Sequence, residues 1–247
     1  MKIYLAACLE CSEIKDEDIK KTPYVLQTFY SINDKTAKRL DMVNDILLDS
    51  GAFSLRNKGT NDHSIYEDYV EQYAEFINKH NIKHFFELDI DNIVGYAKVV
   101  EYRKKLERLT NKQPIVVWHP QRGIEEYYNH CKEYKYIALG GFVAATLQKR
   151  NQYLKLYPNF INVAHKYGCK IHGLGFTSLQ KLPYLHFDSV DSTTWLNGVK
   201  YGILYKFNGK TLVATGAPEG KRGNSKLIQR INFEEWVKFQ KYAEARF

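Results

Sequence analysis

The sequence of 247 residues has no long hydrophobic run, which argues against a membrane-spanning protein. No apolar stretch approaches the roughly 20 residues that a transmembrane helix needs. The chain also has no stretch that resembles a linker, an internal repeat or a low-complexity segment. Residues 1–13 carry one lysine and a short apolar run, which lacks the h-region of a signal peptide and is typical of a first strand. The expected location is therefore the cytoplasm, and no membrane partner is expected.

Cysteine is scarce, and its spacing argues against a zinc site. The chain has only Cys8, Cys11, Cys131 and Cys169. Cys8 and Cys11 form a C-x-x-C pair, but no second pair of cysteines or histidines follows at the spacing of zinc ligands. Buried thiols at the end of a strand are the favoured interpretation, and we expect neither a metal nor a cofactor.

The composition has no bias that would indicate disorder. Charged residues make up 26% of the chain and hydrophobic residues 44%, as in ordinary folded proteins. The formal net charge of +8 permits an anionic partner such as nucleic acid, although a lysine-rich solvated surface explains it equally well. The length fits one domain that spans residues 1–247.

What the chain does contain is a regular alternation of strand-like and helix-like segments. Eight apolar runs of strand length lie at 3–8, 24–30, 46–53, 84–90, 114–120, 136–142, 170–176 and 186–192. One of the intervals between them places apolar side chains along a single helical face, namely Ile65, Tyr69, Tyr73, Phe76 and Ile77. This alternation predicts an α/β fold, either a (β/α)8 TIM-like barrel or a doubly wound sheet, and the length of about 250 residues favours the barrel.

Three further elements are expected in the second half of the chain. Residues 145–168 have helical periodicity at both ends, and Pro158 predicts a break or a new first turn between them. A hairpin that turns at Asn208-Gly209 follows the eighth strand. Residues 232–247 are predicted to form a closing helix with Asn232 as its N-cap.

Polar residues and glycines gather at the predicted strand ends, where the catalytic residues of such barrels lie. They are Asp49, Ser50, Gly51, Asp89, Asp91, His119, Gly140, Gly141, Gly173, Gly175, Asp188 and Asp191. Each alone is equally typical of a turn, but carboxylates or glycine pairs recur at five strand ends, which favours a site. Because side chains three apart in a strand point to opposite faces, only one of Asp188 and Asp191 can face the barrel mouth. The other is expected to hold a turn or a backbone amide.

The order of these motifs resembles the tRNA-guanine transglycosylase superfamily. The motifs are "LLDSGAFS", "ELDID", "YIALGGFV", "KIHGLGF" and "FDSVDSTTW", and the resemblance covers roughly residues 46–195. The first and last are the most specific. The resemblance implies a pentosyltransferase that exchanges a guanine base through a covalent aspartyl-sugar intermediate, with an oxocarbenium-like transition state.

The same resemblance implies roles for individual residues. Asp49 would act near the leaving base as general acid and base, and Asp89 would accept two hydrogen bonds from the guanine edge. The nucleophile falls on Asp191 or Asp188, and Asp191 is favoured. The remaining candidates for substrate contacts are Ser50, Gly51, Phe53, His119, Gly140, Gly141 and Gly173. For Phe53 a stacking role and a place in the core are both open, and for His119 a structural role is open beside substrate binding.

The departures from the tRNA enzymes bear on the substrate. No cysteine follows Cys169, so their Cys-x-Cys-x-x-Cys and His zinc site is absent, and "STTW" replaces the Pro-Thr-Arg after the nucleophile. A compact, zinc-free chain is more similar to the DNA-guanine transglycosylases of phages and bacteria, so that the location would be the host cytoplasm for a phage protein. DNA is therefore the expected polymer, with tRNA as the alternative, and a free 7-deazaguanine such as preQ0 the incoming base.

Other functions stay open at this point. A hydrolase that cuts the N-glycosidic bond would use the same residues with water as the acceptor. A barrel that only binds nucleic acid is the non-catalytic alternative. The basic segment 220–226 is a candidate clamp on the polymer backbone. Whether helper proteins open a DNA duplex for the enzyme is left open by the sequence.

Overall fold

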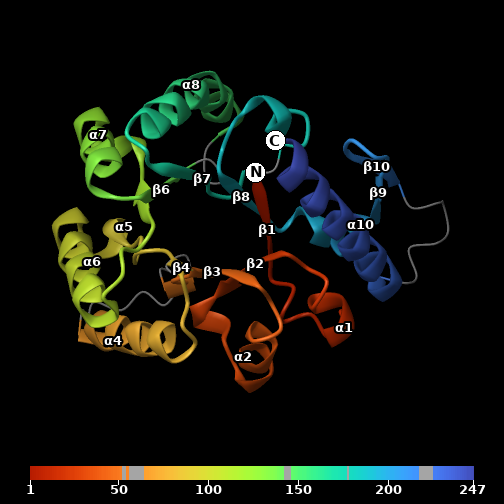
Figure 1. The fold of residues 1–247 in the computed structure, drawn as a ribbon, viewed down its shortest axis with the longest axis horizontal. Helices are drawn as coiled ribbons and strands as arrows, with labels where there is room; N and C mark the ends of the chain where they lie inside the picture. Colours follow the sequence, from red (N-terminus) through yellow and green to blue (C-terminus); the bar gives the residue numbers. More distant parts are fainter. Residues whose placement is uncertain (52–53, 56–63, 142–145, 177, 217–224) are drawn as a thin grey trace.

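Eight parallel strands form a ring in the computed structural model, which describes residues 1–51, 54–55, 64–141, 146–176, 178–216 and 225–247 (Figure 1). In chain order the strands are β1 (Lys2–Ala6), β2 (Tyr24–Thr28), β3 (Asp45–Asp49), β4 (His84–Phe85), β5 (Val116–Trp118), β6 (Tyr136–Leu139), β7 (Lys170–Gly173) and β8 (Ser189–Ser192). Consecutive strands pair from β1 to β4 and from β5 to β8, β8 returns to pair with β1, and a single bridge links the segments after β4 and before β5. The predicted TIM-like barrel is thus confirmed, and the doubly wound sheet is excluded.

The ring has one weak seam, between β4 and β5. The ladder there is reduced to a single bridge between Phe86 and Ile115. The amide of Ile115 donates to the carbonyl of Phe85 (2.7 Å), and the amide of Glu87 donates back to Ile115 (3.1 Å). The carboxylate of Glu87 then accepts the amide proton of Val117 on β5 (2.9 Å). A side chain therefore extends the pairing where the backbone ladder stops.

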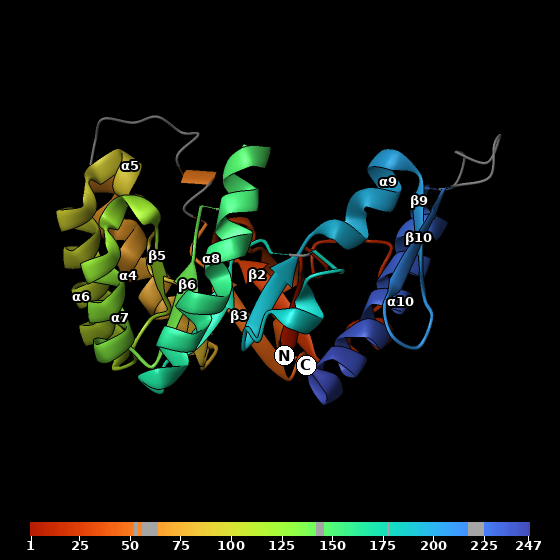
Figure 2. The same cartoon turned by 90° about the horizontal axis from the view of Figure 1, so that it is seen from above.

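Helices surround the ring on its outer side (Figures 1 and 2). They are α1 (Asp16–Ile19), α2 (Asp34–Leu40), α4 (Ser64–Lys79), α5 (Asp91–Val94), α6 (Tyr96–Thr110), α7 (Ile124–Glu133) and α8 (Leu147–Lys166). The short α9 (Asn197–Tyr201) lies beside the C-terminal hairpin and helix instead (Figure 2). The predicted apolar face of α4 packs against the barrel, with Tyr73 and Ile77 fully buried. Between β7 and β8, the described residues contain only a short 3-10 turn, at Leu182–Tyr184.

The break predicted at Pro158 is absent, because α8 runs through this residue. A proline inside a helix removes one hydrogen bond and strains the preceding turn. Tyr157 and Ile161 lie on either side of Pro158 and are both buried against the barrel. Their packing holds the two halves of the helix in line, so tertiary contacts override the local signal.

A hairpin and a long helix complete the described chain. The hairpin consists of β9 (Ile203–Phe207) and β10 (Leu212–Gly216), and the helix is α10 (Ser225–Arg246). The turn is the predicted one at Asn208-Gly209, where the Asn208 side chain accepts the amide protons of Lys210 and Thr211. The helix packs against both β1 and β9 and so joins the hairpin to the barrel (Figure 2).

The prediction that Asn232 caps the closing helix is wrong. The helix begins seven residues earlier, at Ser225, and Asn232 is buried in its interior. Its side chain accepts the amide of Tyr205 (2.8 Å) and donates to the carbonyls of Ile203 (2.9 Å) and Trp195 (3.2 Å). Asparagine is common at helix starts, but here its side chain forms hydrogen bonds to the backbone of β9. The sequence pattern does not distinguish an N-cap from such an interior residue.

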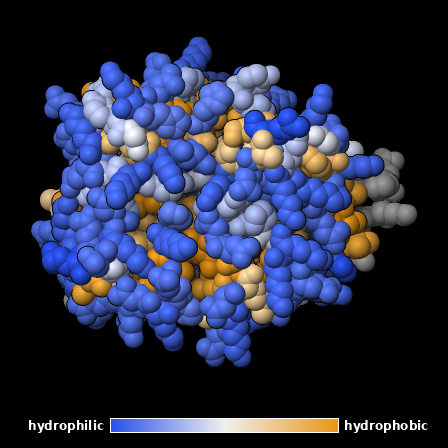
Figure 3. Space-filling view, viewed as in Figure 1, coloured by the Kyte–Doolittle hydropathy of each residue, from blue (hydrophilic) through white to orange (hydrophobic). Residues whose placement is uncertain are grey.

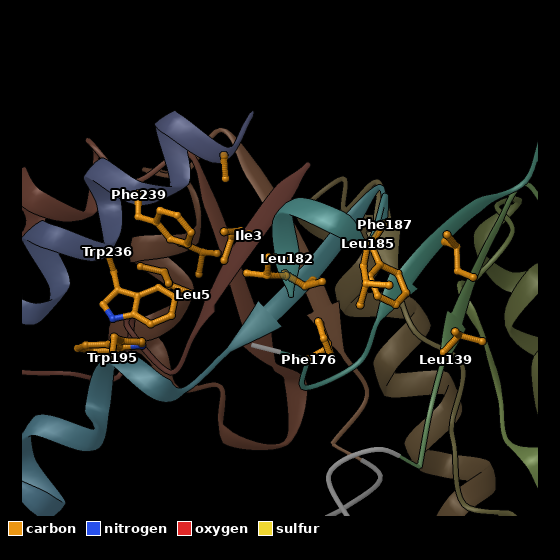
Figure 4. Packing of buried hydrophobic residues seen from close by; sticks show 14 of the residues in the cluster. Ile3, Leu5, Leu139, Phe176, Leu182, Leu185, Phe187, Trp195, Trp236 and Phe239 are labelled. Atoms are coloured by element: carbon orange, nitrogen blue, oxygen red, sulfur yellow. The ribbon is translucent and has the colours of Figure 1, made fainter. Parts of the chain in front are cut away.

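The alternation of β1 shows how the core is divided. Ile3 and Leu5 point outward and pack under Trp236 and Phe239 of α10 (Figure 4). The intervening Tyr4 points into the ring. The interior cluster consists of Tyr4, Ala6, Tyr24, Leu26, Leu47, Phe86, Ile115, Val117 and Ala138. The barrel is therefore a filled core rather than a channel.

Polar residues cover most of the face seen in Figure 3, with apolar side chains visible between them in places. Large hydrophobic side chains that are exposed, such as Leu147 and Tyr184, lie on different helical segments. Within the part of the chain that the structure describes, no helix combines the length and the apolar character needed to cross a bilayer.

Candidate functional site

The carboxyl ends of three strands bring three aspartates together. Asp49 is the last residue of β3, Asp89 follows β4, and Asp191 lies near the end of β8. The negative charges of Asp191 and Asp89 both act on the Asp49 carboxyl, so the three groups share one region. We call this end of the barrel the mouth and define it by these three residues. It is the end at which the active sites of such barrels lie.

Asp49 is held in a setting that disfavours its charge. Burial raises the pKa of the Asp49 carboxyl to about 6, and the nearby charges of Asp191 and Asp89 add to this effect. The amide of Gly51 and the hydroxyl of Thr28, each 3.3 Å from Oδ2, lower the pKa and only partly offset the rise. Among the described residues, no lysine, arginine or histidine pairs with Asp49. A carboxyl with this pKa can exchange a proton near neutral pH.

The residues that follow Asp49 are packed tightly under the mouth. Gly51 has a φ of +79°, and an added Cβ would lie 2.5 Å from the Cβ of Tyr30, so only glycine fits. Ser50 is buried, its carbonyl accepts the hydroxyl of Tyr69 (2.6 Å), and its own hydroxyl has no partner among the described residues. Phe53, the predicted stacking residue, lies outside the described residues.

Asp191 is fixed by two hydrogen bonds to one of its oxygens. Oδ1 accepts the amide of Gly175 (2.6 Å) and pairs with Nε2 of His172 (3.1 Å). Neither of these bonds reaches Oδ2. The side chain of Asp191 is 12% exposed, so the carboxylate is oriented by these two bonds and stays partly accessible.

Asp188 lies at the other end of the barrel, although it was a candidate nucleophile. Its Oδ2 accepts the amide of Ile171 (2.8 Å) and pairs with Nε2 of His165 (3.0 Å). Its carbonyl accepts the amide of Lys2, where β1 begins. Asp188 precedes β8, so the strand separates it from Asp191, and its side chain holds a backbone amide instead of reaching the mouth.

Asp89 is held by two cationic or polar partners. Both of its oxygens lie near Nε2 of His119, at 2.8 and 2.7 Å. Arg122 donates to Oδ1 from Nη2 (3.0 Å). Asp89 and His119 are each a little under one-fifth exposed, so this pair borders the mouth.

A buried ion cluster supports Asp89 from beneath. Arg122 is almost fully buried and also pairs with Glu87 (3.2 Å) and Asp91 (3.3 Å). Glu87 is fully buried and pairs with Arg103 (2.6 Å). Each buried charge has an opposite charge beside it, as burial requires. The cluster fixes Asp89 as an acceptor at the edge of the mouth.

The glycines at the strand ends have different environments. An added Cβ on Gly140 would lie 2.4 Å from Cε1 of His119, so this glycine makes room for the imidazole. The neighbouring Gly141 has a φ of +86°, which favours glycine. An added Cβ on Gly173 would meet the ring of Phe187 at 3.1 Å, in the core outside the ring. Gly140 and Gly141 therefore border the mouth, whereas Gly173 faces the hydrophobic shell.

Trp195 is fully buried and donates from Nε1 to the carbonyl of Ala6 (2.9 Å). Residues 220–224 of the basic segment lie outside the described ranges, and Lys226 at its end pairs with Glu13 (3.1 Å). Within those ranges, no three side chains of the metal-binding types are grouped in a way that could hold a metal ion.

The sequence interpretation missed His172 and Arg122. His172 is a fully buried polar residue in the middle of an apolar strand, and this mismatch is a usable signal. Arg122 follows β5 in a short 3-10 turn, and nothing local distinguishes it from a solvated arginine. Its importance depends on the ion cluster, which only the folded chain brings together.

Comparisons with known proteins add the following. No protein-family model matches the chain, and no curated protein matches it. The solved structures that match include the carboxyl transferase domain of Rhizobium etli pyruvate carboxylase with pyruvate (TM-score 0.46) and with oxalate (TM-score 0.45). Identity is 12% in both cases, and the matches cover 98% of this chain and 48% of those chains. The chain thus spans about half the length of these proteins.

Proposed function

We propose that this protein is a base-exchange transglycosylase that replaces guanine in DNA with a 7-deazaguanine such as preQ0. One observation supports the proposal above all. Three carboxylates from three strands meet at one mouth in different electrostatic settings. Asp191 is hydrogen-bonded as an acceptor, whereas burial raises the pKa of Asp49 to about 6. Such a pair divides into a charged nucleophile and a proton carrier.

In the first step, an oxygen of the Asp191 carboxylate bonds to C1′ of the sugar while the bond between C1′ and N9 of guanine breaks. The electron pair of the broken bond leaves with guanine, and the proton of Asp49 neutralises it. The sugar is then an ester of Asp191, and Asp49 is a carboxylate.

In the second step, N9 of the incoming 7-deazaguanine attacks C1′, and the ester bond to Asp191 breaks. The electron pair of that bond returns to the Asp191 carboxylate. The proton on N9 passes to Asp49, which restores both residues to their initial states. Two displacements at C1′ retain the configuration of the sugar.

Asp89 is the group that reads the base in this proposal. A carboxylate accepts two hydrogen bonds, and guanine offers N1–H and its exocyclic amine as a matching pair. Adenine and the pyrimidines lack this pair and would leave the carboxylate unsatisfied. Arg122 and His119 support this role because they hold Asp89 in place beside the mouth.

The target base has to leave its helix to reach a site of this kind, or to lie in a single strand from the outset. The experiment therefore supplies the protein with a single-stranded DNA oligonucleotide or a tRNA, together with radiolabelled guanine or preQ0. Incorporation of label is measured for each polymer. A denaturing gel reports any covalent adduct between protein and polymer.

The expected result is label in DNA and a gel-stable adduct that Asp191→Ala abolishes while binding of DNA persists. Label in tRNA alone would assign the same chemistry to the other polymer. Release of free guanine without an acceptor base would identify a hydrolase. Binding with neither adduct nor label would leave only the non-catalytic barrel and would overturn the proposal.

A further inference from the structure

A line of hydrogen-bonded side chains runs from Asp191 into the interior of the barrel. Nε2 of His172 contacts Oδ1 of Asp191 (3.1 Å), and Nδ1 of His172 contacts the hydroxyl of Ser189 (2.5 Å). The hydroxyl of Tyr136 contacts the same Ser189 oxygen (2.5 Å). His172 and Ser189 are fully buried. Interiors of such barrels are filled mostly by branched apolar side chains, so this polar line needs an explanation.

The chemistry of the groups sets the direction of the line. A carboxylate can only accept, so Nε2 of His172 carries a proton and donates it to Asp191. In a neutral imidazole, Nδ1 then accepts, and Ser189 is its donor. The Ser189 oxygen accepts in turn from the hydroxyl of Tyr136. Every donor in the line thus points toward Asp191, and each bond polarises the next.

Two aromatic rings fix the plane of the imidazole. The ring of Phe86 lies 5.3 Å from that of His172, centroid to centroid, at an interplanar angle of 66°. The ring of Tyr4 lies 6.4 Å from that of His172, centroid to centroid. Tyr4 is on β1 and is in register with Asp191 on β8. His172 cannot turn away from Asp191 without disturbing this interior packing.

We propose that His172 is a positioning residue for the nucleophile, with Ser189 and Tyr136 behind it. This role rests on the proposed function of Asp191. The imidazole holds Oδ1 together with the Gly175 amide, which directs Oδ2 toward the sugar carbon in the mouth. It also donates to the carboxylate that leaves C1′ in the second step, and so stabilises the charge that develops there.

The first test needs no turnover. Histidine side chains labelled with ¹⁵N are observed by NMR in the wild-type protein, and His172→Gln assigns the signal among the eight histidines of the chain. The expected state has Nε2 protonated, and Asp191→Ala should shift this signal. A ring with its proton on Nδ1 and a bare Nε2 would mean that Asp191 is the donor, and that result would overturn the proposal.

The second test measures exchange on the DNA oligonucleotide. His172→Phe keeps the volume and removes the donor, and we expect kcat to fall about 100-fold, as for the loss of one preorganised donor to a developing charge. KM for the base should not change, because His172 does not touch it. His172→Gln keeps an N–H near the position of Nε2 and should recover most of the loss, which a purely structural role would not predict.

His165→Gln is the matched control, because His165 pairs with the other aspartate of the "DSVD" segment at the opposite end of the barrel. It should leave kcat unchanged. If His172→Phe forms the adduct at the same rate as the wild-type protein, the role of His172 is refuted and the proposed function is not. Absence of any adduct in the wild-type protein would refute the proposed function and this role with it.

Discussion

The two ends of the barrel carry the same kinds of side chain in opposite electrostatic settings. At the amino end, Asp45 pairs with Lys2 (2.5 Å) and Asp188 with His165 (3.0 Å). At the mouth, Asp49 has no cationic partner among the described residues and feels the charge of Asp191. Both aspartates of the amino end are paired, whereas at the mouth Asp89 and Asp191 are paired and Asp49 is not. A carboxyl whose pKa is raised by burial and by neighbouring carboxylates is a mark of functional sites.

The largest expected difference between the two ends concerns Asp191 at the mouth and Asp188 at the amino end. Asp191→Asn should lower the exchange rate by about 10⁴-fold or more, as expected for loss of a nucleophile. Asp188→Ala should keep the rate and lower the free energy of unfolding by about 1 kcal/mol, because the Ile171 amide loses its acceptor. Exchange assays and urea denaturation of both variants measure the two effects. Loss of activity in Asp188→Ala alone would contradict the assignment of ends.

Removing one cation from each end of the barrel should lower the free energy of unfolding by different amounts. Arg122→Met leaves Glu87, Asp89 and Asp91 without their shared partner and should cost about 3–5 kcal/mol of unfolding free energy. Lys2→Met removes a pair whose lysine is 39% exposed and should cost less than about 1 kcal/mol. Chemical denaturation measures both. Equal losses would show that the ion cluster at the mouth has no special weight.

Substituting Asp89 tests whether the mouth reads the base. In Asp89→Asn an amide replaces one acceptor oxygen, and kcat/KM for guanine should fall about 10–100-fold, the value of a hydrogen bond to a charged group. Asp91→Asn is the control, because Asp91 shares Arg122 but is not a predicted contact of the base. Competition between guanine and adenine measures the selectivity. Similar losses in both variants would indicate that Arg122, rather than Asp89, governs the effect.

The smallest effect concerns the pH dependence of stability. Because burial raises the pKa of Asp49 to about 6 from 3.8, the folded protein holds a proton between these pH values that the unfolded chain has released. The contribution of Asp49 to the free energy of unfolding therefore falls as the pH rises across this interval and is constant above it. Asp49→Asn removes this cost, so its Tm should exceed that of the wild-type protein above pH 6 by about 2–4 °C for each kcal/mol gained.

Thermal unfolding of both proteins at pH 4 and pH 8 checks the sign. The difference in Tm should be much smaller at pH 4, where the folded wild-type protein is neutral at this position and the unfolded chain is only partly ionised. A difference that is the same at both pH values would mean that Asn alters packing rather than charge. The variant should also lack exchange activity, since its amide cannot carry the proton.

Most of the fold could be predicted because its signals are local. Apolar runs mark the strands, and Asn208-Gly209 marks the hairpin turn, since both depend on neighbouring residues only. The errors at Asn232 and Pro158 arise where a local signal competes with packing. The Asn232 amide is hydrogen-bonded to β9, and Pro158 lies between two buried neighbours. Both environments depend on tertiary contacts, which the spacing of residues in the sequence does not reveal.

The acidic residues of the candidate site could be predicted from the sequence, whereas their hydrogen-bond partners could not. Parallel strands end at one edge, so Asp49, Asp89 and Asp191 could be placed together from the chain order. The pairing of His172 depends on the register of β7 with β8, where it lies opposite Ser189. Strand alternation separates Asp188 from Asp191 but does not say which end each one faces. The catalytic roles of these residues stay predictions.

The seam between β4 and β5 has a consequence for ligand binding. Backbone ladders join the other strands of the ring, whereas here Glu87, Asp89, His119 and Arg122 reach across from one strand end to the other. Under the proposed function, a purine that engages Asp89 would compete for the oxygens that also link the ends of β4 and β5. Ligand binding and local opening of the seam would then be coupled, and deuterium uptake by the amides of Glu87 and Ile115 would measure the opening.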